Sequence, residues 1–148
     1  MIGSRTTGRH NRTRSIRIKS FLLALLCFAL TGHSAAQEKE PTYRLGTETT
    51  VSGTVTRLFT KTGQRGTPRQ RATLKQADDS TIDIHIGPTS FIADKKMMPK
   101  IGDQLTVTGS RVVEDTRPLV VVRRIVRGSQ VLDMRKADGT RLWPDSYR

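Results

Sequence analysis

The segment that most restricts the fold of this chain is residues 81–86, TIDIHI, in which polar residues and isoleucine alternate without exception. Side chains of a β-strand point alternately to the two faces of a sheet, so the three isoleucines share one face, which must be buried. Thr81, Asp83 and His85 share the opposite face, which we expect to be solvated. One half-buried strand requires neighbouring strands.

Strand patterns recur on both sides of this segment. Valine alternates with polar residues from Thr49 onward, and Gly53 inside that stretch is typical of a bulge or a strong bend. Residues 72–76 predict a short strand that a tight turn joins to 81–86. Two longer strands are predicted at 104–113 and 118–128, and the unbroken apolar start of the second indicates burial on both faces.

Residues 89–100 are the one segment that favours a helix, with a cap at Thr89 or Ser90 and with Phe91 and Ile92 in the core. Five short strands with one helix between the third and fourth are the layout of an OB-fold. The predicted fold class is therefore all-β with one short helix: a five-stranded OB-fold-like Greek-key barrel plus a short C-terminal strand and turn extension. Another small β-barrel or a sandwich is the alternative.

The N-terminus has the three parts of a secretory signal peptide. Six basic residues lie within 5–19, an apolar run covers 21–30, and small residues follow at Ser34-Ala35-Ala36. The apolar run is about half of the ~20 residues that a membrane-spanning helix needs. We therefore expect Sec-type export with cleavage near Ala36, rather than an uncleaved anchor, and a periplasmic or secreted protein.

The predicted organisation is a signal peptide at 1–36, a flexible lead-in at 37–48, the barrel at 49–128 and the C-terminal extension at 129–148. The single cysteine, Cys27, lies inside the signal peptide. The mature chain would consequently have no disulfide, no cysteine nucleophile and no thiolate metal site.

The chain is basic, with a formal net charge of +13 that falls to +7 once the signal residues are removed. A basic balance favours an anionic ligand, a membrane surface or an acidic protein as partner, and it is equally typical of a protein that is merely well solvated. Nucleic acid is not expected as a partner, because export removes the chain from the cytoplasm. The sequence does not indicate an oligomeric state.

Residues 60–71, TKTGQRGTPRQR, predict a basic loop, because two glycines and a proline interrupt any regular pattern. Together with the arginines of strand 118–128, this loop forms the predicted contact surface, although which of the two makes the contact is left open. The candidate partner-binding residues are Lys61, Arg65, Arg69, Arg71, Arg123, Arg124 and Arg127.

Three stretches, VSGTVTRL, ATLKQADDSTIDIHI and IGDQLTVTGSRV, together with VVVRRIVRG, carry a family resemblance. Over residues 51–128 the chain resembles the small exported bacterial OB-fold (BOF-like) periplasmic proteins. The resemblance implies an OB-fold barrel in the periplasm and a link with stress tolerance, and none of these stretches is a catalytic motif. We interpret the chain as an exported, non-enzymatic binding or scaffold module, for which no cofactor is expected.

Two alternative functions are a copper site and a polyanion-binding site. Asp83 and His85 project from one strand, and with Met97 or Met98 they would suit copper, but two ligands at i and i+2 are a weak signal and no metal is expected. A polyanion-binding role of the nucleic-acid type would use basic loops and stacking aromatics. The predicted outer face of strands 72–76 and 81–86 has no aromatic, since Phe59, Phe91 and Trp143 are assigned to the core or the barrel ends.

Overall fold

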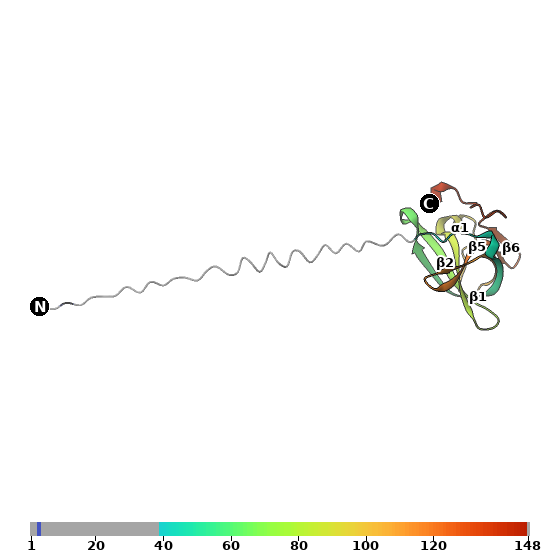
Figure 1. Cartoon of the computed structure of the whole chain (residues 1–148), viewed down its shortest axis with the longest axis horizontal. Helices are drawn as coiled ribbons and strands as arrows, with labels where there is room; N and C mark the ends of the chain where they lie inside the picture. The colour runs from blue at the N-terminus through green and yellow to red at the C-terminus, as the bar shows by residue number, and fades with distance from the viewer. Residues whose placement is uncertain (1–2, 4–38, 148) are drawn as a thin grey trace. The chain divides into compact units, whose positions relative to one another are not determined.

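The computed structural model describes residue 3 and residues 39–147, and Figure 1 shows the described strands wrapped around a common core. The strands are β1 (Glu48–Thr62), β2 (Pro68–Lys75), β3 (Thr81–Pro88), β4 (Gln104–Glu114), β5 (Arg117–Arg127) and β6 (Gln130–Asp133). The helices are α1 (Thr89–Asp94) and three 3-10 turns, η1 (Leu45–Thr47), η2 (Gln64–Gly66) and η3 (Asp145–Tyr147). Apart from Gly3, the predicted signal peptide and its cleavage site lie outside the described residues.

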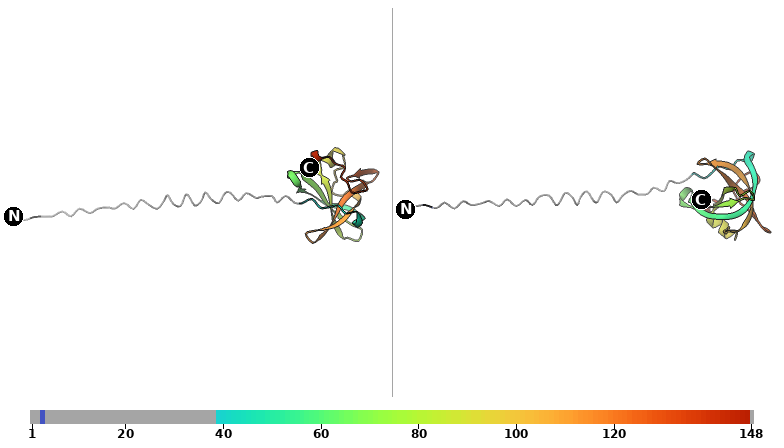
Figure 2. Two further views of the ribbon diagram at one scale, coloured as in Figure 1. Left: turned by 45° about the horizontal axis from the view of Figure 1, so that its top comes forward. Right: turned by 90° about the horizontal axis from the view of Figure 1, so that it is seen from below.

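Five of the strands close into a barrel. β1 pairs antiparallel with both β2 and β4, β2 pairs with β3, and β4 pairs with β5. The ring closes where β3 runs parallel to β5, with His85 opposite Val121. α1 lies between β3 and β4 in the chain, so the predicted fold class, a five-stranded OB-fold-like barrel with one short helix and an additional C-terminal strand, is confirmed (Figure 2).

β1 serves both halves of the barrel because it bends near Gly53. Its first part, as far as Thr54, pairs with β4, and its second part, from Thr54, pairs with β2 after a register shift between Val55 and Arg57. A Cβ atom at Gly53 would lie 2.5 Å from the carbonyl oxygen of Lys75. Glycine is therefore required where the two strands approach, as the sequence predicts.

The predicted core is confirmed. Ile82, Ile84 and Ile86 are at most 5% exposed, and the whole Val120–Val122 stretch is buried. Phe91 and Ile92 of α1 are buried as well. The helix itself is shorter than predicted, because it ends at Asp94, and its N-cap is Pro88 with no side-chain cap, so the predicted capping by Thr89 or Ser90 is wrong.

The predicted basic loop is mostly strand. β1 continues to Thr62 and β2 begins at Pro68, which leaves only the short connection around η2 between them. Residues 60–62 and 68–71 belong to one continuous antiparallel ladder, in which Lys61 lies opposite Arg69 and Phe59 opposite Arg71. The glycines mark the turn correctly, but the polar residues around them are strand positions.

The C-terminal extension packs on the barrel beyond β6. Trp143 is 4% exposed and lies against Gly87 and, with the two ring centroids 6.3 Å apart, against Phe91 of α1. Gly87 has a φ of +144°, and a Cβ atom there would lie 2.7 Å from the Met134 terminal methyl. The assignment of Trp143 to the core or a barrel end is therefore confirmed.

Candidate binding face

Arg69 and Arg71, which the sequence analysis places on a solvated loop, are buried residues of β2. Their exposed fractions are 2% and 3%. Both side chains lie outside the barrel, since Ala72 and Leu74 alternate with them and belong to the core. They are covered from outside by other parts of the chain, and the prediction that they form an exposed, flexible contact loop is wrong.

Arg71 is held by Glu114, the last residue of β4. Its two terminal nitrogens donate to the two carboxylate oxygens of Glu114, one of them over 2.7 Å. Lys61 lies 3.4 Å from the same carboxylate. The hydrogen bonds from Arg71 hold the pKa of Glu114 below its ordinary value, against the opposing effect of burial. Of the predicted loop residues, Arg65 alone remains at an exposed turn, in the left-handed region with φ 60°.

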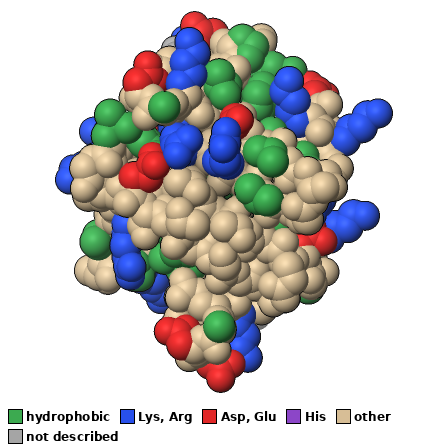
Figure 3. Space-filling view, turned by 90° about the vertical axis from the view of Figure 1, so that its right-hand side faces the viewer, with side chains coloured by type: hydrophobic (Ala, Val, Ile, Leu, Met, Phe, Trp, Pro, Cys, Tyr) green, Lys and Arg blue, Asp and Glu red, His purple; other side chains and the backbone are tan. Residues whose placement is uncertain are grey.

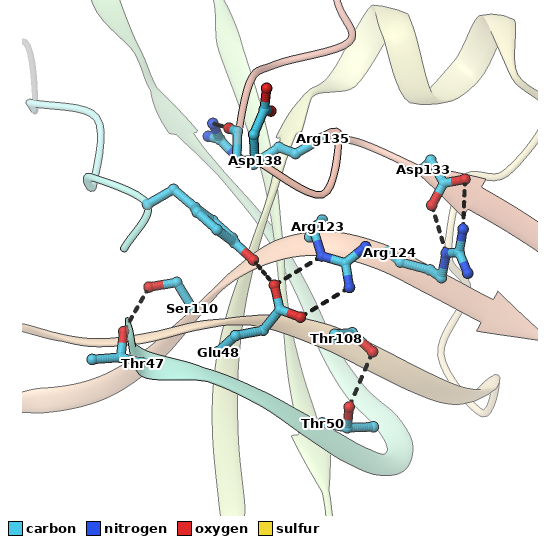
Figure 4. A network of polar contacts seen from close by, with 12 residues as sticks. Thr47, Glu48, Thr50, Thr108, Ser110, Arg123, Arg124, Asp133, Arg135 and Asp138 are labelled. Carbon is cyan, nitrogen blue, oxygen red and sulfur yellow. Dashed lines mark hydrogen bonds and ion pairs between the residues drawn. The ribbon is translucent and has the colours of Figure 1, made fainter. Parts of the chain in front are cut away.

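The three arginines predicted as the contact surface of β5 also have polar partners within the chain. Arg123 donates two hydrogen bonds, of 2.8 and 2.9 Å, to Glu48, and Arg124 donates two, of 2.6 and 3.1 Å, to Asp133 (Figure 4). Arg127 donates to Asp103 at 3.0 Å and to the carbonyl of Met98 at 2.9 Å. These contacts connect β5 to β1, to β6 and to the start of β4.

Those pairings neutralise the predicted basic surface. The hydrogen bonds from Arg123 lower the pKa of Glu48, and those from Arg124 lower the pKa of Asp133, so both carboxylates stay charged beside their arginines. Figure 3 shows the same arrangement on one face, where basic and acidic side chains are interspersed. The sequence pattern does not show these partners, because they lie between 9 and 75 positions away from the arginines along the chain.

His85 is not the solvated residue that the alternation of β3 predicts. It is 2% exposed and lies under Glu40, whose carboxylate is 3.7 Å from its Nε2 atom. Burial lowers the pKa of His85, and the neighbouring Glu40 offsets this only in part. The prediction for this position is wrong because residues 39–44, treated as a flexible lead-in, contact the outer face of the barrel here.

The alternative copper site is not assembled. Asp83 accepts a hydrogen bond of 2.6 Å from the Thr73 hydroxyl, whereas His85 faces Glu40. Met97 and Met98 lie beside Arg127, six residues along β5 from the partner of His85. Among the described residues, no group of three or more histidine, cysteine, aspartate or glutamate side chains could hold a metal ion.

A groove of about 300 Å³ remains open on the outer face, between β1 and the turn from β4 to β5. Arg57 and Phe59 line it from β1, and Arg117 lines it from the start of β5. The Arg71–Glu114 pair also lines it. The Arg57 guanidinium lies 4.7 Å from the centre of the Phe59 ring, which is a cation–π contact.

Phe59 is a functional candidate that the sequence analysis missed. It is half-buried in the groove rather than in the core, so its assignment to the core or a barrel end is wrong. The adjacent Leu58 packs against the core. Because neighbouring strand residues face opposite sides, the position of Leu58 could have placed Phe59 outside.

Comparison with known protein families identifies the family of this chain. The model of the MamS/MamX magnetosome protein family matches residues 47–132, which is more than half of the chain. The chain belongs to this family. The resemblance to the BOF-like periplasmic proteins predicted from the sequence is supported in one respect, the OB-fold-like barrel. The family model that matches is that of MamS/MamX. Comparison with curated protein sequences finds no match.

Among solved structures, the N-terminal domain of PriB from Thermoanaerobacter tencongensis is 16% identical, with a TM-score of 0.45, over 57% of this chain and 99% of that chain. The single-stranded DNA binding protein from Thermus aquaticus is 18% identical, with a TM-score of 0.47, over 67% of this chain and 49% of that chain. A small single-stranded DNA-binding protein from Streptomyces coelicolor is 13% identical, with a TM-score of 0.43, over 61% of this chain and 97% of that chain.

Within residues 39–147, no helix is both long and apolar enough to span a bilayer.

Proposed function

We propose that this chain is an exported, non-enzymatic OB-fold binding module that holds an acidic protein segment in the groove between β1 and the β4–β5 turn. The observation that carries the proposal is the composition of this groove. Arg57 and Phe59 present a cation and an aromatic ring side by side, and Arg117 faces them from the other wall. In OB-folds the face of strands two and three and the loop between the fourth and fifth strands are where oligonucleotides and oligosaccharides bind, and the groove includes residues of both.

The charges of the groove favour a carboxylate-bearing partner. Three acidic residues line it, Asp83, Glu114 and Asp115, of which Asp83 is engaged by Thr73 and Glu114 by Arg71. Arg57 and Arg117 have no carboxylate partner among the described residues, so their guanidinium groups are available to an incoming carboxylate. Guanidinium groups bind carboxylates through paired hydrogen bonds, and Phe59 adds apolar contact beside them.

The direct test is fluorescence anisotropy of a labelled glutamate-rich peptide with the mature protein. Replacing both Arg57 and Arg117 by alanine should weaken binding about 2- to 30-fold, which corresponds to about 0.2–1 kcal/mol for each exposed ion pair. Binding by the unchanged protein should also weaken as salt is added. Lys136→Ala is the matched control, because it removes an exposed cation from the C-terminal turn, outside the groove.

A polyanion of the nucleic-acid type is the second candidate, and Phe59 is the observation that favours it. A half-buried ring in a basic groove could stack on one base, which contributes about 1–3 kcal/mol. One ring supports less binding than the several that such surfaces use, so we expect a thymidine oligonucleotide to bind more weakly than the acidic peptide. Tighter oligonucleotide binding that Phe59→Ala abolishes would replace the first candidate with this one.

Anionic lipid vesicles make the third arm of the same experiment. A membrane surface recruits spread basic charge rather than a groove. If Lys136→Ala and the groove variants weaken vesicle binding equally, the vesicles contact the basic charge of the whole surface rather than the groove. Binding of the peptide that neither arginine influences would overturn the proposal.

A further inference from the structure

Residues 39–44, here called the N-terminal strap, lie across the outer side of the barrel. Glu40 of the strap contacts Arg69 of β2 and His85 of β3. Within the described residues, the first hydrogen bond from the strap backbone to the barrel is at Arg44, whose amide donates to the Ser110 hydroxyl over 3.0 Å. The strap before Arg44 is therefore fastened mainly by its side chains.

The Glu40 carboxylate lies in a strongly basic, buried site. Its oxygens lie 3.9 Å from Nη2 of Arg69, 3.6 Å from Nη1 of Arg141 and 3.7 Å from Nε2 of His85. Arg135, mostly buried between the rings of Tyr43 and Trp143, adds a third guanidinium within electrostatic reach. We call Arg69, His85, Arg135 and Arg141 the cationic site.

The electrostatics of this site favour an anion strongly. Burial by itself raises the pKa of Glu40, but the His85 side chain and the charges of Arg69 and Arg141 outweigh it and hold that pKa below its ordinary value. The Glu40 carboxylate thus contacts Arg69 and Arg141 and also lies within electrostatic reach of Arg135. Burial lowers the pKa of Arg135, and the charge of Arg141 acts in the same direction, whereas the charge of Glu40 opposes both.

The geometry shows that a carboxylate fills this site poorly. All three contacts of Glu40 are longer than the 2.7–2.9 Å that is typical of a charge-assisted hydrogen bond. The Oε1 atom of Glu40 has no hydrogen-bond partner among the described residues, and neither has Nδ1 or Nε2 of His85. His85 is 2% exposed, and a buried polar group without a partner is destabilising.

From this mismatch we propose that the cationic site binds a phosphate-type oxyanion, and that Glu40 occupies the site as a tethered substitute. A phosphate carries four oxygens and more negative charge than a carboxylate, so it can engage several guanidinium forks and the imidazole together. The proposal goes beyond the proposed function, because Arg57 and Arg117 of the groove take no part in the cationic site.

Binding would also move the strap. The strap forms one wall of a hollow of about 600 Å³ whose other wall is Arg111–Glu114 with Pro118. An oxyanion that displaces Glu40 would release the loosely fastened part of the strap, before Arg44, and would widen this hollow. The oxyanion can be an inorganic ion or the phosphate group of a larger molecule, and the chemistry of the site is the same for both.

The test is calorimetric titration of the mature protein with inorganic phosphate, at constant ionic strength. A tethered competitor acts at an effective concentration on the order of millimolar, so Glu40→Ala should tighten phosphate binding about tenfold or more. Glu40→Gln keeps the shape of the side chain and should act in the same direction. Asp133→Asn is the matched control, since it removes a carboxylate that pairs with Arg124 of β5, outside the cationic site, and it should leave phosphate binding unchanged.

Further arms identify the site and the ligand. Adding Arg141→Ala to Glu40→Gln should abolish the gain in phosphate affinity, because Arg141 is part of the cationic site. The fold should tolerate this change, since the Arg141 side chain is partly exposed. Acetate should compete weakly, and a phosphorylated sugar that binds more tightly than inorganic phosphate would show that the group belongs to a larger ligand. Phosphate binding by both Glu40 variants no tighter than by Asp133→Asn, or a gain that survives Arg141→Ala, would overturn the proposal. Neither result bears on the groove, which has its own test.

Discussion

The first prediction concerns stability. If Arg71 is buried against Glu114, its loss should destabilise the fold, whereas the loss of an arginine on an exposed loop should not. Replacing Arg71 by methionine keeps an unbranched apolar stem in place of the arginine methylenes but leaves Glu114 without its two charge-assisted hydrogen bonds. Such bonds contribute about 1.5–3 kcal/mol each. The side chain of Glu114 is 20% exposed and Lys61 stays 3.4 Å away, so part of this loss is recovered. We expect Arg71→Met to lower the free energy of unfolding by about 2–3 kcal/mol.

The assay is urea unfolding followed by the fluorescence of Trp143, the single tryptophan, which is buried in the folded protein. In a thermal scan the same change should lower the melting temperature by about 10–20 °C, since 1 kcal/mol shifts a domain of this size by roughly 4–8 °C. Arg65→Met is the control, because Arg65 lies at an exposed turn, and its effect should stay within about 0.5 kcal/mol.

Dependence on pH gives a second readout of the same pair. The pKa of Glu114 is lowered in the folded protein, so its ionised form stabilises the fold above the ordinary glutamate pKa, and this contribution is lost as pH falls through the lowered value. Arg71→Met should therefore flatten the acid side of the stability curve relative to Arg65→Met. Equal stabilities of the two variants, within about 0.5 kcal/mol at neutral pH, would refute the assignment of Arg71 as a buried structural cation.

Two further predictions test the core and the export. Ile84→Ala should cost about 2–5 kcal/mol in unfolding free energy, because the side chain is wholly buried, whereas exposed Thr81→Ala should stay within about 0.5 kcal/mol. Similar losses at both positions would mean that β3 has the other register. N-terminal sequencing of the exported protein should begin near Gln37, and recovery of a full-length species in the membrane fraction alone would contradict cleavage.

The barrel could be predicted because the patterns that indicate its strands each lie within a short stretch of sequence. The alternation at 81–86 fixes which face of β3 is buried, and the glycine in β1 marks its bend without knowledge of any other strand. The outer face could not be predicted in the same way. Arg71 is buried only because Glu114, 43 positions later, reaches it, and His85 only because Glu40 lies over it. Polar alternation identifies the outside of a barrel but not what covers it.

The coverage of Arg69 and His85, unlike that of Arg71, comes from the segments that flank the barrel. Arg69 and His85 lie within residues 47–132, the part shared with the MamS/MamX family, whereas Glu40 and Arg141 lie outside it. Arg69 also donates a hydrogen bond of 2.8 Å to the carbonyl of Tyr147, near the C-terminus. Burying an arginine without such partners would be strongly unfavourable. The barrel thus places arginines on its outer face, the flanking segments cover Arg69 and His85, and the groove at Arg57 and Phe59 stays open.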